Sequence, residues 1–109
     1  MKTILIALLL ANQLFASSLC QAYSTSVMQA IKSAAKRVST SVPEWQFRLA
    51  VAEDLNKLSV NGDWGPGILE EVSSIGETTA RIYGRSATMN QAMDACNRQM
   101  KRNDSLQNQ

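Results

Sequence analysis

The residues best suited to chemistry in this chain carry sulfur and lie near its C-terminus. Met89, Met93, Cys96 and Met100 are separated by four, three and four positions, so they share one face of a helix. Sulfur ligands select Cu(I), and a second helix carrying Met28 would complete such a site. The same spacing is typical of a seam between packed helices, where Met fills gaps and Cys is a small buried hydrophobe. We predict the seam, with no metal ion and no other cofactor, and keep a soft-metal carrier as the third functional hypothesis.

The remaining reactive side chains do not combine into a catalytic centre. The chain has no histidine, which excludes Ser–His and Cys–His pairs and the usual zinc sites. A glycosidase needs two carboxyl groups that face each other across a cleft, whereas the adjacent Glu70 and Glu71 point to different sides of a helix. The sequence therefore predicts a protein that is not an enzyme and has no catalytic residues.

A turn rich in glycine carries one of the two tryptophans. The stretch from Leu55 to Val72 reads LNKLSVNGDWGPGILEEV and includes three glycines, one proline and Trp64 within seven residues. Gly62 permits positive φ, and Pro66 can start a helix because its missing N–H has no partner there. Trp64 is then either a plug packed under the turn or a platform for a sugar ring.

This stretch resembles the helix–turn–helix core of the small peptidoglycan-binding domains found in cell-wall hydrolases and phage endolysins. In that family a helix ending in Leu-Asn-x-Leu-Gly leads into Asp-Gly-x-aromatic-Gly-Pro-x-Thr, and a second helix containing Ala-Val follows. The matching residues are Leu55, Asn56, Leu58, Gly62, Trp64, Gly65, Pro66 and Val72. Asn61 stands where the family has Asp, whereas Ile68 and Glu71 replace its Thr and Ala. The resemblance implies peptidoglycan contact through the turn Asn61–Gly67, with ligand-binding residues Asn61, Gly62, Asp63, Trp64, Gly65 and Pro66.

The N-terminus has the outline of a secretory signal peptide. Lys2 precedes an apolar run from Ile4 to Ala11, and small and polar residues follow it. The run is shorter than the about 20 residues needed to span a bilayer. Small residues at the two positions that the peptidase reads favour cleavage after Ala22, which makes residues 1–22 the signal peptide.

Two alternatives to that cleavage site change the fate of the cysteines. Cleavage after Ala22 leaves Cys96 as the single cysteine of the mature chain. Cleavage after Ser18 also meets the small-residue rule, and Cys20 could then pair with Cys96. A lipid anchor on Cys20 is the third option, disfavoured because the large Leu19 precedes the cysteine.

Removal of residues 1–22 leaves a single domain, residues 23–109. A chain this small buries only about 60% of its unfolded surface, so an envelope protein or a second copy would supply further burial. Without Lys2 the chain carries 10 basic and 9 acidic residues, which gives no electrostatic footprint for nucleic acid. We therefore predict a periplasmic or secreted protein that has no membrane span in its mature chain and binds no nucleic acid.

The mature chain is predicted to be all-α, a small bundle of three or four helices. The first helix is expected to start at the capping residues Ser24–Ser26, and the second after a capping box of Ser41 and Glu44. Ser86 is expected to cap the last helix, and the polar tail after Lys101 is expected to fray. Apolar residues at helical spacing predict the buried faces of the second and third helices: Trp45, Leu49, Ala52, Leu55 and Leu58, widened by Phe47 and Val51, and then Leu69, Val72, Ile75, Thr79 and Ile82.

Three small residues in the third helix, Gly76, Ala80 and Gly84, are spaced four apart. Such a row allows another backbone to approach closely, either within the chain's own core, which is favoured, or in a docked partner. The leading functional hypothesis is an exported, non-enzymatic accessory protein of the cell envelope that contacts peptidoglycan. The alternative is a protein–protein accessory factor of an envelope-spanning secretion or conjugation system, docking through these three residues.

Overall fold

The protein folds into helices joined by short connections. The computed structural model describes the backbone of residues 2–62 and 64–107 and the side chains of residues 19–59, 64, 65 and 67–103. Its elements are α1 (Lys2–Arg37), α2 (Glu44–Gly62), α3 (Pro66–Tyr83), the 3-10 turn η1 (Gly84–Ser86) and α4 (Met89–Gln107). The described backbone contains no strand, which confirms the predicted all-α bundle.

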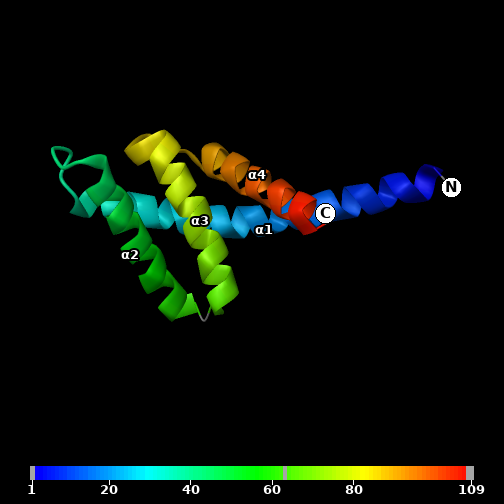
Figure 1. Ribbon diagram of the computed structural model, residues 1–109, viewed down its shortest axis with the longest axis horizontal. Coiled ribbons are helices and arrows are strands. Elements are labelled where there is room, and N and C mark those ends of the chain that lie inside the picture. Colours follow the sequence, from blue (N-terminus) through cyan, green and yellow to red (C-terminus); the bar gives the residue numbers. More distant parts are fainter. Residues whose placement is uncertain (1, 63, 108–109) are drawn as a thin grey trace.

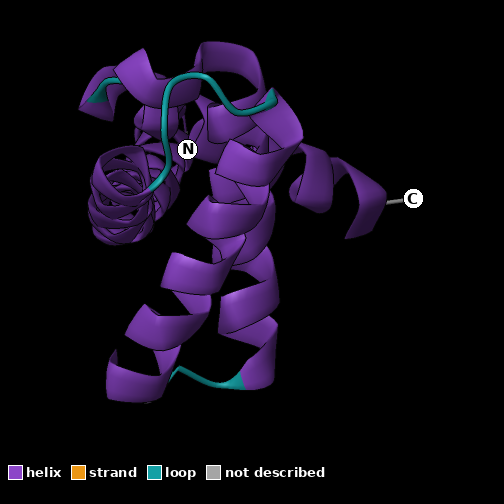
Figure 2. Ribbon diagram, turned by 90° about the vertical axis from the view of Figure 1, so that its left-hand side faces the viewer, coloured by secondary structure: helices purple, strands orange, loops and turns teal. Residues whose placement is uncertain are grey.

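The longest helix, α1, organises the other three. It runs along the long axis of the molecule, which extends 58 Å, and it contacts α2, α3 and α4 (Figure 1). α4 runs back beside α1, whereas α2 and α3 form a hairpin that leaves α1 at a steep angle. Figure 2 shows this hairpin in profile, with the α2–α3 turn at the end farthest from α1.

The core lies where the hairpin meets α1. Val27 of α1, Leu55 of α2 and Ile75 of α3 are fully buried. Gly76 makes this meeting possible, because a Cβ atom built on it would lie 2.5 Å from Leu55 Cδ1 and 3.7 Å from Val27 Cγ2. One turn along α3, the buried Thr79 hydroxyl donates a hydrogen bond to the Ile75 carbonyl (2.7 Å), so its polar atom is satisfied.

The buried face of α2 differs from the predicted stripe. Trp45 and Leu49 were expected in the core, but they are 56% and 53% exposed. Among the described side chains of this helix, residues 44–59, the buried ones are Phe47, Ala50, Val51, Asp54, Leu55 and Ser59. The prediction is confirmed for Phe47, Val51 and Leu55 and wrong for Trp45 and Leu49. Residues 45–52 are apolar on nearly every side, so their pattern does not single out one face. In α3, Val72, Ile75 and Thr79 are buried as predicted, whereas Ile82 is 58% exposed.

Several helix boundaries also differ from the sequence prediction. α1 does not start at Ser24, which is fully buried inside a continuous helix. Thr88 rather than Ser86 caps α4: its hydroxyl accepts a hydrogen bond from the Gln91 N–H (3.3 Å), and its own N–H donates to Gln91 Oε1 (2.9 Å). α4 continues beyond Lys101 to Gln107, and residues 108–109 lie outside the described range.

Two arginines fasten the base of the hairpin to the end of α1. Arg37 donates hydrogen bonds to Asp54 Oδ1 (2.9 Å) and to the Ala50 carbonyl (3.2 Å). Arg85 donates to the carbonyls of Ala35 (3.0 Å) and Ser39 (2.6 Å). The Ala35 carbonyl belongs to the last turn of α1, and Ser39 lies just beyond the helix. The end of a helix leaves carbonyl groups without partners and favours positive charge.

Within the described residues, none of the helices combines the length and the apolar character that crossing a membrane requires.

Candidate functional site

The predicted peptidoglycan-contacting turn lies at the free end of the α2–α3 hairpin. α2 ends at Gly62, and α3 starts at Pro66 with Gly65 as its extended N-cap residue (φ −67°, ψ 163°). Asp63 lies outside the described residues, as do the side chains of Asn61 and Pro66. The turn therefore joins two well-formed helices at a point remote from α1, as Figure 2 shows.

Trp64 is only half-buried at this turn. Its side chain packs against the edge of the hydrophobic core, and its backbone N–H donates a hydrogen bond to the Ser59 carbonyl (3.3 Å). The neighbouring Gly65 and Gly67 are exposed, and a Cβ atom on either would meet nothing within 4 Å. Ile68, in the first turn of helix α3, is 42% exposed. The end of the hairpin thus presents part of an indole ring and an aliphatic side chain beside open backbone.

The row of small residues in α3 lies inside the molecule. Gly76 and Ala80 are buried, and Gly76 is in contact distance of Leu55 and Val27. Gly84 is half-buried, starts η1 and adopts φ +66°, a conformation that favours glycine. Because α1 and α2 already cover Gly76, a partner helix could reach it only if those helices moved.

The sulfur-bearing face of α4 packs toward α1. Met93 and Met100 are half-buried against the core, and Cys96 is fully buried. Cys96 forms a disulfide with Cys20 of α1, and the two Cα atoms are 5.6 Å apart. A sulfur held in a disulfide is not a thiolate ligand, so this arrangement does not offer the thiolate that the soft-metal hypothesis required. Among the described residues, His, Cys, Asp and Glu side chains form no group of three that could hold a metal ion.

An apolar hollow, which the sequence did not predict, lies on the outer side of the hairpin. It has a volume of about 350 Å³ and is formed by Trp45, Arg48, Leu49 and Ala52 of α2 with Ser73 and Glu77 of α3. Trp45, Leu49 and Ala52 are spaced four and three apart, so they form one stripe along α2. This outer stripe is the part of the predicted core face that the fold leaves in contact with solvent.

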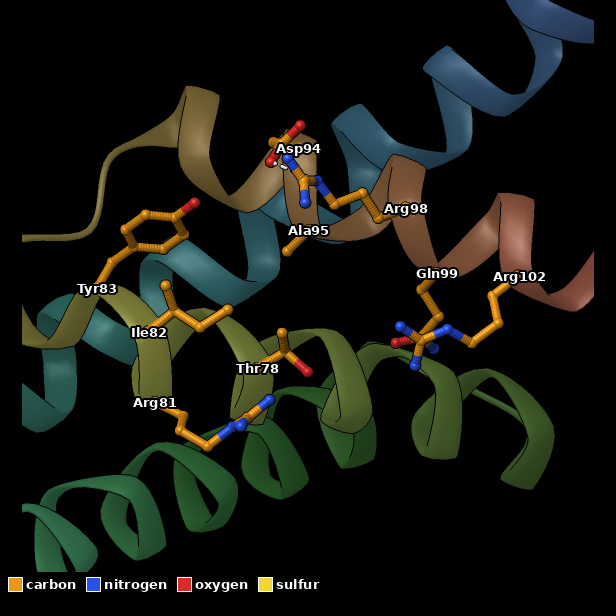
Figure 3. Close-up of a pocket in the computed structure, with 9 residues that line it drawn as sticks. All are labelled: Thr78, Arg81, Ile82, Tyr83, Asp94, Ala95, Arg98, Gln99 and Arg102. Atoms are coloured by element: carbon orange, nitrogen blue, oxygen red, sulfur yellow. Dashed lines mark ion pairs between the residues drawn. The ribbon is translucent and has the colours of Figure 1, made fainter.

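A second cleft, lined by arginines, separates α3 from α4. Figure 3 shows its nine residues: Thr78, Arg81, Ile82 and Tyr83 of α3, and Asp94, Ala95, Arg98, Gln99 and Arg102 of α4. The cleft has a volume of about 330 Å³, and Arg98 forms an ion pair with Asp94 (3.0 Å). Guanidinium groups bind carboxylates and phosphates, so this surface is suited to contact with anionic groups. The helical spacing of Arg98 and Arg102 was a sequence signal for it.

Tyr23 lies at the contact of α1 with the hairpin. Burial, and then the negative charge of Glu71, raise the pKa of its phenol above the ordinary value of 10.0. This direction moves the phenol further from the range in which it would act as a base at neutral pH.

Comparison of the chain with protein-family models, with curated proteins and with solved structures finds no match. Its function is therefore inferred from its own residues.

Proposed function

We propose that this chain is an exported, non-enzymatic accessory protein of the cell envelope, and that the end of the α2–α3 hairpin contacts peptidoglycan. The observation that carries the proposal is the position of the turn. The hairpin projects from α1 and places the turn at its far end (Figure 2), where Trp64 is half-buried and Gly65 and Gly67 are exposed. A projecting end of this kind can reach into an open polymer mesh without disturbing the core.

The chemistry of the turn suits a shallow sugar-binding surface. An aromatic ring offers a flat apolar face that can pack against the C–H side of a sugar ring. Gly65 and Gly67 leave the backbone beside Trp64 open, because a Cβ atom at either position would meet nothing within 4 Å. Export is supported by Lys2 and the apolar run from Ile4 to Ala11, which have the outline of a signal peptide.

The test compares the two tryptophans, because one lies at the turn and the other on the outer face of α2. The purified chain and its Trp64→Ala and Trp45→Ala variants are sedimented with purified peptidoglycan sacculi. Trp64→Ala is expected to reduce retention by about tenfold, the effect of losing one aromatic contact of about 1.4 kcal/mol. Trp45→Ala is expected to bind like the wild type, and Trp64→Phe to retain most of the binding.

Circular dichroism and the melting temperature separate binding from folding. Trp64 is only half-buried, so its truncation should lower the melting temperature but leave a folded helical protein. If the wild type is not retained on sacculi, peptidoglycan contact is wrong. If Trp45→Ala rather than Trp64→Ala reduces retention, the contact lies on α2 and the turn is not the site.

A second candidate function is favoured by the outer stripe of α2. Trp45 and Leu49 are more than half exposed and line an apolar hollow beside Glu77. Large exposed apolar side chains are typical of protein interaction sites, and Trp is enriched among residues that dominate binding energy. This observation supports the protein–protein accessory factor of an envelope-spanning system, with the docking face on α2 instead of the small residues of α3.

Site-specific crosslinking in intact cells tests this second candidate. A photocrosslinker at position 49 should yield one discrete adduct, whereas a crosslinker at the exposed position 57 should yield none. An adduct of twice the chain mass would identify self-association. Absence of any adduct from position 49 would contradict docking at this face.

A further inference from the structure

The N-terminal part of α1 extends beyond the rest of the molecule. Figure 1 shows the first turns of this helix running past the described end of α4, and in this view none of the other described elements lies beside them. The described side chains of α1 begin at Leu19. Leu19 is half-buried, and Cys20 and Ser24 are fully buried. The packed body of the protein therefore includes residues that lie before Ala22.

The disulfide adds a covalent reason to keep these residues. Cys20 of α1 and Cys96 of α4 are both fully buried and are bonded to each other across 76 positions of the chain. Disulfides persist in oxidising compartments such as the bacterial periplasm and the exterior of cells. A cleavage after Ala22 would remove Cys20 and leave Cys96 as an unpaired buried thiol.

We propose that the signal peptidase cleaves after Ser18, so that the exported chain begins at Leu19 and carries the Cys20–Cys96 disulfide. Ala16 and Ser18 supply the small residues at the two positions that the peptidase reads. This processing site differs from the one that the sequence favoured, after Ala22. It rests on the export part of the proposed function and not on contact with peptidoglycan.

The proposal involves two covalent steps, hydrolysis of a peptide bond and formation of a disulfide. Hydrolysis of the Ser18–Leu19 peptide bond consumes one water and yields a carboxylate on the released peptide and an ammonium group on Leu19. Bond formation between the two cysteines releases two protons and two electrons, which a disulfide-carrying thiol oxidoreductase accepts as its disulfide is reduced to a dithiol. A lipid anchor on Cys20 would need a thioether bond at the sulfur atom that the disulfide with Cys96 already uses. The side chain of Cys20 is also fully buried, which leaves no room for a lipid on it.

The test uses the full chain, expressed with its own leader in a bacterium that exports proteins. Intact mass under non-reducing conditions should correspond to residues 19–109, and reduction should add two hydrogen atoms. A chain that starts at Tyr23, or one acylated on Cys20, would overturn the proposal. An unprocessed chain beginning at Met1 would overturn both this proposal and export, whereas the sacculi assay tests peptidoglycan contact separately.

Two matched variants locate the cut. Ser18→Phe places a large residue at the position that the peptidase requires to be small, and the Leu19 species should disappear. Ala22→Phe makes the same change at the alternative site, where the side chain is exposed on α1, and the product should still begin at Leu19. The opposite result, with Ala22→Phe blocking processing and Ser18→Phe permitting it, would overturn the proposal.

Discussion

The two ends of the α2–α3 hairpin are held in different ways. At the base, Arg37 and Arg85 connect the hairpin and η1 to the C-terminal end of α1 through long-range hydrogen bonds. At the far end, the hydrogen bonds given by the described backbone are local: Trp64 N–H to the Ser59 carbonyl and Leu69 N–H to the Gly65 carbonyl. Substitutions at the base should therefore change stability, whereas those at the far end should change binding with a smaller effect on stability.

The difference arises because different backbone groups need hydrogen-bond partners at the two ends. The base lies where α1 ends, so its free carbonyls need donors, and arginine can supply several from one side chain. The guanidinium of Arg85 also lies over the Phe47 ring, 4.9 Å from its centre. The far end meets solvent, where water can form hydrogen bonds with free backbone groups. The connection between α2 and α3 is therefore formed by glycines, Pro66 and the packing of Trp64, without long-range hydrogen bonds from its described backbone.

The largest expected effect concerns the disulfide, which joins α1 to α4 and does not involve the hairpin. Cys96→Ala should reduce the free energy of unfolding by about 4 kcal/mol, because the bond closes a long loop in the unfolded chain. Urea unfolding of wild type and variant measures the difference. Addition of a reductant should destabilise the wild type by a similar amount and leave the variant unchanged; equal sensitivity of both would contradict the pairing.

The next prediction compares the two faces of α2. Leu55 is fully buried and contacts the position of Gly76, so Leu55→Ala should cost about 3 kcal/mol of unfolding free energy. Leu49 is 53% exposed, and Leu49→Ala should change stability by less than about 0.5 kcal/mol. Equal losses for the two variants in thermal or urea unfolding would show that the outer stripe is covered in solution.

A smaller effect is expected at the base of the hairpin. Asp54 is buried and accepts a hydrogen bond from Arg37, whereas Glu53 accepts a longer one (3.4 Å) from the same arginine and is exposed. Asp54→Ala should cost about 2 kcal/mol, because it removes a charge-assisted hydrogen bond from a buried site. Glu53→Ala should cost less than about 0.5 kcal/mol, as exposed ion pairs usually do. A reversed order, measured by urea unfolding, would mean that Arg37 pairs mainly at the surface.

The smallest expected effect compares two glycines, one at each end of the hairpin. Gly84, at the base, adopts φ +66° and ψ −148°, a combination that residues with a Cβ atom rarely adopt, so Gly84→Ala should cost about 1 kcal/mol through backbone strain. Gly65, at the far end, has φ −67° and open space around its Cα, so Gly65→Ala should change stability by less than about 0.5 kcal/mol. Melting temperatures of the two variants check this order, and a larger loss at Gly65 would contradict the assignment of the far end as weakly constrained.

The candidate sites show which surface features a sequence pattern can indicate and which it cannot. The turn around Trp64 was recognisable because glycine and proline restrict the backbone locally, whatever the rest of the chain does. The helical spacing of Trp45, Leu49 and Ala52 indicated that they share one face of α2, but the sequence analysis placed that face in the core. The arginine-lined cleft was not predicted, because it exists only where α3 and α4 come together, so that Arg81, Arg98 and Arg102 line one cleft (Figure 3).

The sequence by itself determined the helical class and the approximate positions of the helices. Apolar spacing of three and four, the break at Gly62–Pro66 and the absence of strand-like alternation are local properties, so they can be read without knowing the fold. They also placed Val72, Ile75 and Thr79 correctly on the buried side of α3.

Only the tertiary structure decided which face of α2 is buried and whether the two cysteines meet. Residues 45–52 are apolar nearly all around, so the buried side depends on where α1 and α3 lie. Asp54 occupies a core position because Arg37, 17 residues earlier in the chain, reaches its carboxylate. Cys20 and Cys96 are 76 positions apart, and such a separation in sequence does not fix a distance in space. Contacts of this kind arise from the packing of whole helices, which short-range patterns do not contain.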